Sequence, residues 1–71
     1  MKYIIDSENQ YYNTLRELKN HIYLQSDKDK KAYNGLSILC YKGDNYTGCK
    51  IIKITGSKVI FSRTIKAQSF E

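Results

Sequence analysis

The side chains most clearly suited to a chemical function are a group of cations near the C-terminus. They recur through residues 50–66, in a segment otherwise rich in Ile, Thr and Ser. Such cations neutralise phosphate oxygens, and neighbouring hydroxyl groups add hydrogen bonds that position a phosphate backbone without reading bases. The alternative is an ordinary solvated sheet face, where lysine is common because it discourages aggregation of sheet edges. The candidate residues for binding a nucleic acid or another anion are Lys50, Lys53, Lys58, Arg63 and Lys66.

Tyrosine is the second residue type that carries chemistry, with seven copies in a chain that lacks Trp. Tyr41 and Tyr46 stand close to Lys42, and we expect both in or beside a loop. Exposed aromatic rings among cations stack on unpaired bases or anchor protein interfaces. Tyr41, Tyr46 and Lys42 are therefore candidate partner-binding residues, and the sequence does not separate the two uses.

Residues suited to catalysis or metal binding are sparse. His21 is the only histidine, and no acidic residue stands at a spacing that gives it more than a surface contact. Cys40 and Cys49 lack the second ligand pair of a zinc site, although they could lie near each other across neighbouring strands. We expect both to be free thiols in a reducing cytosol. The chain is thus expected to have no catalytic residues, no metal and no cofactor, and not to be an enzyme.

Size and charge restrict the function classes further. The 71 residues carry a net charge of +5 and fit one small domain, 1–71, which buries only about 60% of the surface of its unfolded chain. The charge favours a nucleic acid or an acidic protein surface as partner. No apolar run approaches the roughly 20 residues of a membrane span, and the start of the chain does not resemble a signal peptide. We expect a cytoplasmic protein with no membrane partner.

The elements that must position the candidate cations begin with a hairpin. Two runs rich in β-branched residues, 50–55 and 58–65, flank Gly56-Ser57, which is the pattern of a two-residue β-turn. Pairing Thr55 with Lys58 separates an apolar face from a basic one that bears hydroxyl groups. The predicted apolar face holds Ile52, Ile54, Val59, Phe61 and Ile65, and the basic face holds Lys53, Thr55, Lys58, Ile60, Ser62, Thr64 and Lys66.

The same register sets Lys50 opposite Arg63. Like charges that face each other across a strand pair are destabilising. Solvation at the sheet rim, an acidic neighbour or a bound anion would offset the repulsion, and a bulge near Ser62 would remove it. This pair is the most pointed candidate for an anion site.

A helix is expected from about residue 8 to residue 24. Ser7 offers an N-cap, and Gln10 completes a capping box. Apolar side chains then recur with the helical period. The predicted core stripe of this helix is Tyr11, Leu15, Leu18 and Ile22.

The other segments complete a small α+β domain. Residues 2–6 favour a strand, 25–34 a solvated connection, 36–42 a central strand that is apolar on both sides, and 43–48 a loop with glycine at each end. The order strand, helix and three strands predicts one N-terminal helix packed on a small, mainly antiparallel sheet of three to four strands. The position of the first strand in that sheet is left open.

These observations together favour a small non-catalytic binding module. The chain has no Pro and is rich in Ile, Lys, Asn and Tyr, which suggests AT-rich coding and an accessory protein of a phage or mobile element. We expect it to bind a nucleic acid or a nucleoprotein through the basic sheet face. The alternative is a protein–protein interaction module or small inhibitor that docks on a larger host protein. Assembly into a homo-oligomer through sheet edges is a third hypothesis.

Overall fold

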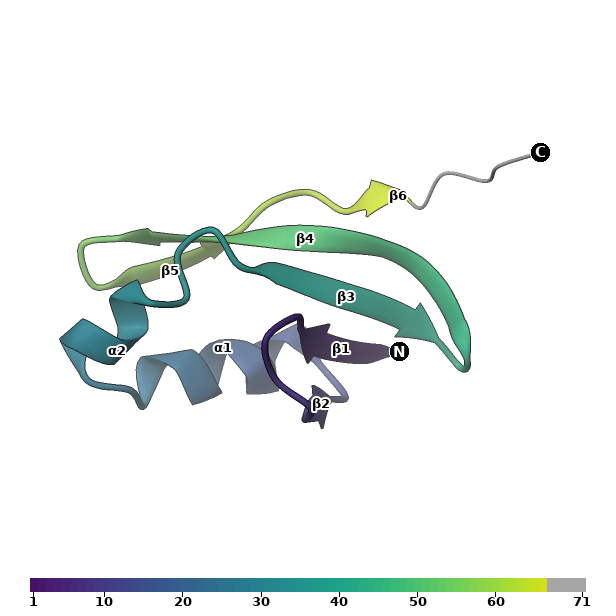
Figure 1. Ribbon diagram of the computed structural model, residues 1–71, viewed down its shortest axis with the longest axis horizontal. Helices are drawn as coiled ribbons and strands as arrows, with labels where there is room; N and C mark the ends of the chain where they lie inside the picture. The colour runs from purple at the N-terminus through teal and green to yellow at the C-terminus, as the bar shows by residue number, and fades with distance from the viewer. Residues whose placement is uncertain (67–71) are drawn as a thin grey trace.

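The computed structural model describes residues 1–66, which form six strands and two helices (Figure 1). The strands pair antiparallel in the order β2-β1-β3-β4-β5, and β6 pairs with β4. The predicted α+β class with an antiparallel sheet is confirmed, whereas the predicted three to four strands and single helix are too few. The elements are β1 (Lys2–Ile5), β2 (Tyr11–Tyr12), α1 (Leu15–Tyr23), α2 (Asp27–Lys31), β3 (Ser37–Lys42), β4 (Asn45–Thr55), β5 (Lys58–Phe61) and β6 (Ile65–Lys66).

The meander of β3, β4 and β5 follows the predicted hairpin register. Thr55 pairs with Lys58, Ile54 with Val59 and Ile52 with Phe61. Gly56 makes the turn at φ 61°, a left-handed conformation in which a side chain would be strained. β1 lies on the other side of β3 and pairs with it antiparallel, which places β3 and β4 in the middle of the sheet.

The first helix begins at Leu15, seven residues later than predicted from a start at residue 8. Its N-cap is Thr14, whose hydroxyl oxygen accepts a hydrogen bond from the backbone N–H of Glu17 at 3.1 Å. The carboxylate of Glu17 accepts in turn from the backbone N–H of Asn13 at 3.3 Å. The predicted cap at Ser7 is therefore wrong.

Tyr11 and Tyr12 form β2 instead of the first turns of a helix. An extended backbone directs adjacent side chains to opposite faces, so Tyr12 is buried while Tyr11 is 53% exposed. Tyr11 in the helical core stripe was a wrong prediction. Leu18 and Ile22 are fully buried as expected.

The predicted connection 25–34 contains a second helix, α2. Ser26 caps it by accepting from the backbone N–H of Asp29 at 3.2 Å. Lys30 is buried, with its ammonium group 5.3 Å from the ring centre of Tyr23, where a cation–π contact compensates part of its desolvation. Neither helix of the described residues is long and apolar enough to cross a membrane.

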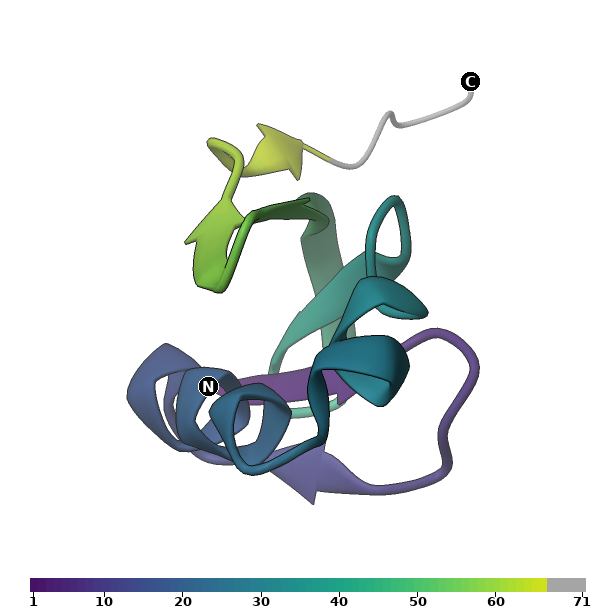
Figure 2. The same cartoon turned by 90° about the vertical axis from the view of Figure 1, so that its left-hand side faces the viewer.

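The sheet curls so that one face, the inner face, packs against the helices (Figure 2). Every strand residue that is buried and bears a side chain belongs to this face by register. Ile65 was expected on it but is 56% exposed and pairs with Cys49 on the opposite, outer face. The core of the described residues consists of Ile5, Tyr12, Leu18, Ile22, Ile38, Cys40, Ile52 and Val59.

The predicted loop 43–48 is a tight turn followed by the start of β4. The register between β3 and β4 shifts by one residue beside Cys40, and Thr47 donates its hydroxyl proton to the carbonyl of Cys40 at 3.2 Å. Gly48 pairs with Lys66 at φ 153°, where an added methyl group would collide with the carbonyl of Ile65. Glycine at this point thus allows β6 to approach β4.

Candidate nucleic-acid interface

Charge is segregated between the sheet and the rest of the described chain. The strands contain six lysines and no Asp or Glu. Residues 1–66 hold their carboxylates in turns, loops and helices, where they accompany the remaining cations. A cationic sheet attracts polyanions through its summed field. The carboxylates of the described residues are Asp6, Glu8, Glu17, Asp27, Asp29 and Asp44.

The outer face of the sheet carries a row of apolar side chains that crosses five strands. Register places these residues directly opposite one another, from β2 through β1, β3 and β4 to β6. At about 4.8 Å per strand, the row is roughly 19 Å wide. None of its members is buried, and both helices lie on the inner side (Figure 1). This outer apolar row is Tyr11, Ile4, Leu39, Cys49 and Ile65.

Tyr41 and Tyr46 lie beside the outer apolar row as a packed pair. They are direct partners across β3 and β4, with ring centres 5.6 Å apart and planes inclined by 60°. Tyr46 was expected in the loop 43–48 but belongs to β4, and 44% of its surface is exposed. Lys2 pairs with Tyr41 on its other side, and its ammonium group lies 5.0 Å from the ring centre of Tyr11.

Lys53 and Lys58 occupy the far end of the same face. Lys53 pairs with Ile60, and Lys58 pairs with Thr55, so the two ammonium groups belong to diagonal neighbours. Both side chains are exposed. The structure therefore places these two predicted residues on the same face as Lys2, at its opposite end, and Lys2 is a residue that the sequence analysis did not select.

The predicted opposition of Lys50 and Arg63 is wrong. The regular β5 ladder ends at Phe61, and the Ser62 side chain replaces its own carbonyl by accepting from the backbone N–H of Ile51 at 2.9 Å. The freed carbonyl of Ser62 accepts from the ammonium group of Lys50 at 3.1 Å. Register places Lys50 opposite buried Ile38, on the inner face. Lys50 is thus tied to the backbone, and Arg63 is exposed after the ladder ends.

The last two predicted cations lie at the margins. Lys42 is the final residue of β3, pairs with Asn45 at the turn, and is exposed. Lys66 pairs with Gly48 and is also exposed. Neither residue belongs to the outer face by register, although both add to the positive charge of the sheet.

The two cysteines are separated by the sheet. Cys40 lies opposite Gly48 on the inner face, whereas Cys49 lies opposite Leu39 on the outer face. Both are free, and burial raises the pKa of the Cys40 thiol. The two thiols, which the sequence allowed to lie near each other across neighbouring strands, therefore point to opposite faces of the sheet.

A polar cluster that sequence reasoning missed lies between the loop after β1, helix α1 and the segment that follows α2. The hydroxyl of Tyr33 donates to the carboxylate of Glu8 at 2.8 Å and lies 3.4 Å from the imidazole of His21. The second carboxylate oxygen of Glu8 is 3.8 Å from the same imidazole nitrogen. Burial, followed by the bond to Glu8, raises the pKa of Tyr33 to about 12. His21 therefore has the acidic partner that its helical spacing did not reveal.

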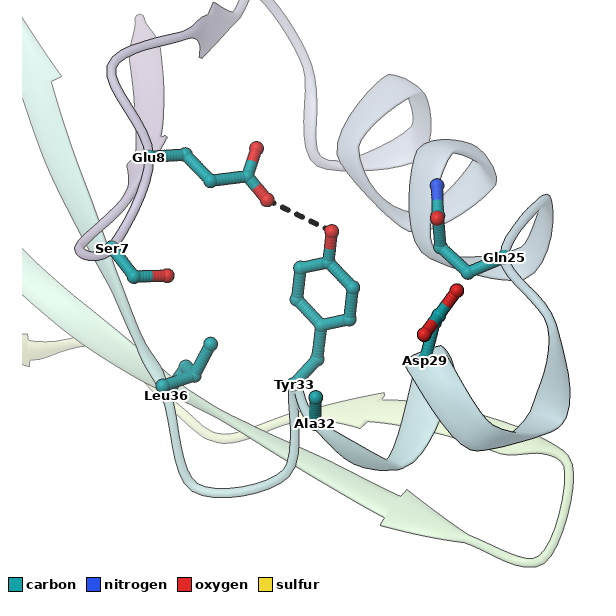
Figure 3. Close-up of a pocket in the computed structure, with 7 residues that line it drawn as sticks. All are labelled: Ser7, Glu8, Gln25, Asp29, Ala32, Tyr33 and Leu36. Atoms are coloured by element: carbon teal, nitrogen blue, oxygen red, sulfur yellow. Dashed lines mark hydrogen bonds between the residues drawn. The ribbon is translucent and has the colours of Figure 1, made fainter.

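Glu8 and Tyr33 also line an open cavity of about 490 Å³ (Figure 3). Its other polar groups are the side chains of Ser7, Gln25 and Asp29. Two carboxylates repel an anion, and Glu8 is already engaged by Tyr33 and His21. The cluster connects the loop after β1 to α1 and to the segment before β3. We interpret it as a tie that holds these segments together.

Within residues 1–66, no three His, Cys, Asp or Glu side chains converge in a way that could hold a metal ion. Comparisons of the chain with protein-family models, curated protein sequences and solved structures gave no significant match. The case for function depends on the chemistry of the surfaces described above.

Proposed function

We propose that this protein is a small non-catalytic module that binds nucleic acid through the outer face of its sheet. The observation that carries the proposal is the segregation of charge, with six lysines and no carboxylate in the strands. Three of these lysines, Lys2, Lys53 and Lys58, belong to the outer face by register and are exposed. Nucleic acid is the polyanion whose regularly spaced phosphates suit such a surface.

In this proposal the protein acts by binding the nucleic acid and catalyses no reaction. Each ammonium group that meets a phosphate releases a condensed counterion, which supplies much of the affinity and makes it depend on salt. The two carboxylates that directly adjoin strand ends in the sequence lie outside the strands, Asp6 after β1 and Asp44 in the turn before β4. A phosphate backbone that crosses the centre of the face therefore meets no carboxylate from the strands.

Affinity measured against salt concentration tests the proposal. A fluorescent single-stranded oligonucleotide is titrated with the protein between about 20 and 200 mM salt, and three phosphate contacts predict a slope of log K against log salt of about −2, or about −3 for a duplex. Substituting Lys53→Ala or Lys58→Ala lowers the affinity and reduces the slope by about 0.7 each. Lys28→Ala is the matched control, because Lys28 is an exposed lysine on α2.

Two outcomes would overturn the proposal. One is the absence of binding to any DNA or RNA, single- or double-stranded, at the lowest salt concentration. The other is equal loss of affinity in Lys28→Ala and Lys53→Ala, which would show attraction by net charge alone. A partner bound independently of Lys53 and Lys58 would favour a protein–protein module instead.

A further inference from the structure

We infer that the outer face takes a single-stranded nucleic acid, whose bases stack on Tyr41 and Tyr46 and cover the outer apolar row. The inference rests on the proposed function and specifies its ligand. It depends on three features of the outer face: its shape, its apolar content and the placement of its lysines.

The shape of the face argues against a duplex. A duplex that is read through its major groove receives an α-helix or a two-stranded ribbon there. Both helices lie on the inner side of the sheet (Figure 1). The β4–β5 hairpin is not free either, because Val59 is buried and its backbone N–H donates to the hydroxyl of Tyr23 on α1 at 3.0 Å. The outer face therefore offers the major groove neither a helix nor the β4–β5 hairpin.

The apolar content of the face matches unpaired bases. A duplex hides the flat apolar surfaces of its bases by stacking, whereas a single strand offers them to aromatic side chains. Tyr46 exposes 44% of its surface, and Tyr41 supports its ring from the neighbouring strand. Next to this pair, Tyr11 and Ile65 mark the two ends of the outer apolar row at 53% and 56% exposure. Phosphates alone would leave these side chains uncovered.

Lysines stand on both sides of the apolar surface. Lys2 adjoins Tyr41 in the same cross-strand row, and Lys53 and Lys58 lie beyond Ile51 at the opposite end. A strand laid across the face would stack its central bases on the apolar surface, while phosphates of the flanking nucleotides meet the lysines at either end. Acidic protein surfaces share the charge, but they carry it on carboxylates scattered among other side chains, whereas a single strand attaches a planar base to every charged unit of its backbone.

The test compares one oligonucleotide in two forms. A labelled oligothymidylate of about 12 nucleotides, within the span that small single-strand sites cover, is titrated alone and as a duplex with its complement at the same salt concentration. An oligouridylate of equal length distinguishes RNA from DNA. We expect the single strand to bind at least tenfold more tightly than the duplex.

Substitution at Tyr46 separates stacking from charge. Tyr46→Leu removes the ring and should weaken single-strand binding about 5- to 100-fold while leaving duplex binding unchanged. Tyr46→Phe keeps the ring and should bind within about twofold of the unaltered protein. Thermal unfolding of both variants confirms that the sheet persists, since Tyr46 is an exposed residue.

The outcomes distinguish this inference from the proposed function. Equal binding of single strand and duplex, or unchanged single-strand binding by a folded Tyr46→Leu variant, would overturn the inference while the proposed function stands. Binding to neither form at low salt would overturn both. Single-strand preference that is lost in Tyr46→Leu and kept in Tyr46→Phe supports it.

Discussion

Tyr33 shows how one hydroxyl group connects distant parts of a small chain. It donates to Glu8, 25 residues earlier in the sequence, and lies beside His21 on α1. A hydrogen bond to a charged acceptor of this kind contributes about 1.5 to 3 kcal/mol. Tyr33→Phe keeps the ring and removes only this bond, so we expect the free energy of unfolding at neutral pH to fall by that amount. Urea unfolding of the two proteins measures it.

The pH dependence of the same residue gives a second readout. The pKa of Tyr33 is about 12 in the folded protein, against 10.0 for an unperturbed tyrosine. The unfolded chain therefore loses this proton first as the pH rises, and the stabilisation declines between about pH 10 and 12. The difference in stability between the unaltered protein and Tyr33→Phe should be constant below pH 9 or so and should narrow above pH 10. A constant difference up to pH 11 would contradict the assignment.

At the level of elements, Thr14 sets the start of α1. Its hydroxyl satisfies the backbone N–H of Glu17, which has no partner within the helix. Thr14→Ala should lower the free energy of unfolding by about 1 kcal/mol. Ser7→Ala is the matched control, because a Ser7 cap was expected from the sequence while the structure starts the helix elsewhere. Its effect should stay within about 0.5 kcal/mol, and a larger effect for Ser7→Ala than for Thr14→Ala would contradict the observed helix start.

The elements that the sequence predicted well are those whose signals are local. The Gly56-Ser57 turn and the alternating residues around it determine their own register, and Leu18 and Ile22 mark the core side of α1 by their spacing. The start of α1 was missed because Tyr11 happens to continue the helical period. Only pairing with β1, a tertiary contact, selects the extended conformation for Tyr11 and Tyr12.

The candidate site was predictable in part for the same reason. Lys53 and Lys58 were placed on one face because the hairpin register is local. Tyr41 and Tyr46 were selected from the sequence, but their packing depends on a register shift between β3 and β4. No residue type in the sequence predicted that shift. Lys2 joined the face through long-range pairing of β1 with β3. The break at Ser62, which separates Lys50 from Arg63, was weighed as one of several alternatives.

For the whole molecule, the segregation of charge carries a cost in stability. Lys53 and Lys58 are diagonal neighbours on the outer face, and the β-carbons of such pairs are somewhat less than about 7 to 8 Å apart. No strand residue supplies a carboxylate to offset them. The surface that we propose for polyanion binding is therefore destabilised by its own charges until a ligand or salt screens them.

This cost can be measured with Lys58→Gln. Removing one of two neighbouring like charges should raise the free energy of unfolding by about 0.3 kcal/mol at 20 mM salt. The gain should vanish near 0.5 M salt, where the screening length falls to about 4 Å. Urea is the denaturant to use, because it leaves the ionic strength unchanged. Lys28→Gln, beside Asp27 and Asp29 on α2, should show no such gain. If Lys58→Gln instead destabilised the protein at low salt, then Lys58 would contribute favourable contacts to the folded state. In that case, binding of a partner would not be needed to explain why position 58 is a lysine. Higher stability together with weaker nucleic-acid binding in the same variant would link both properties to a single charge.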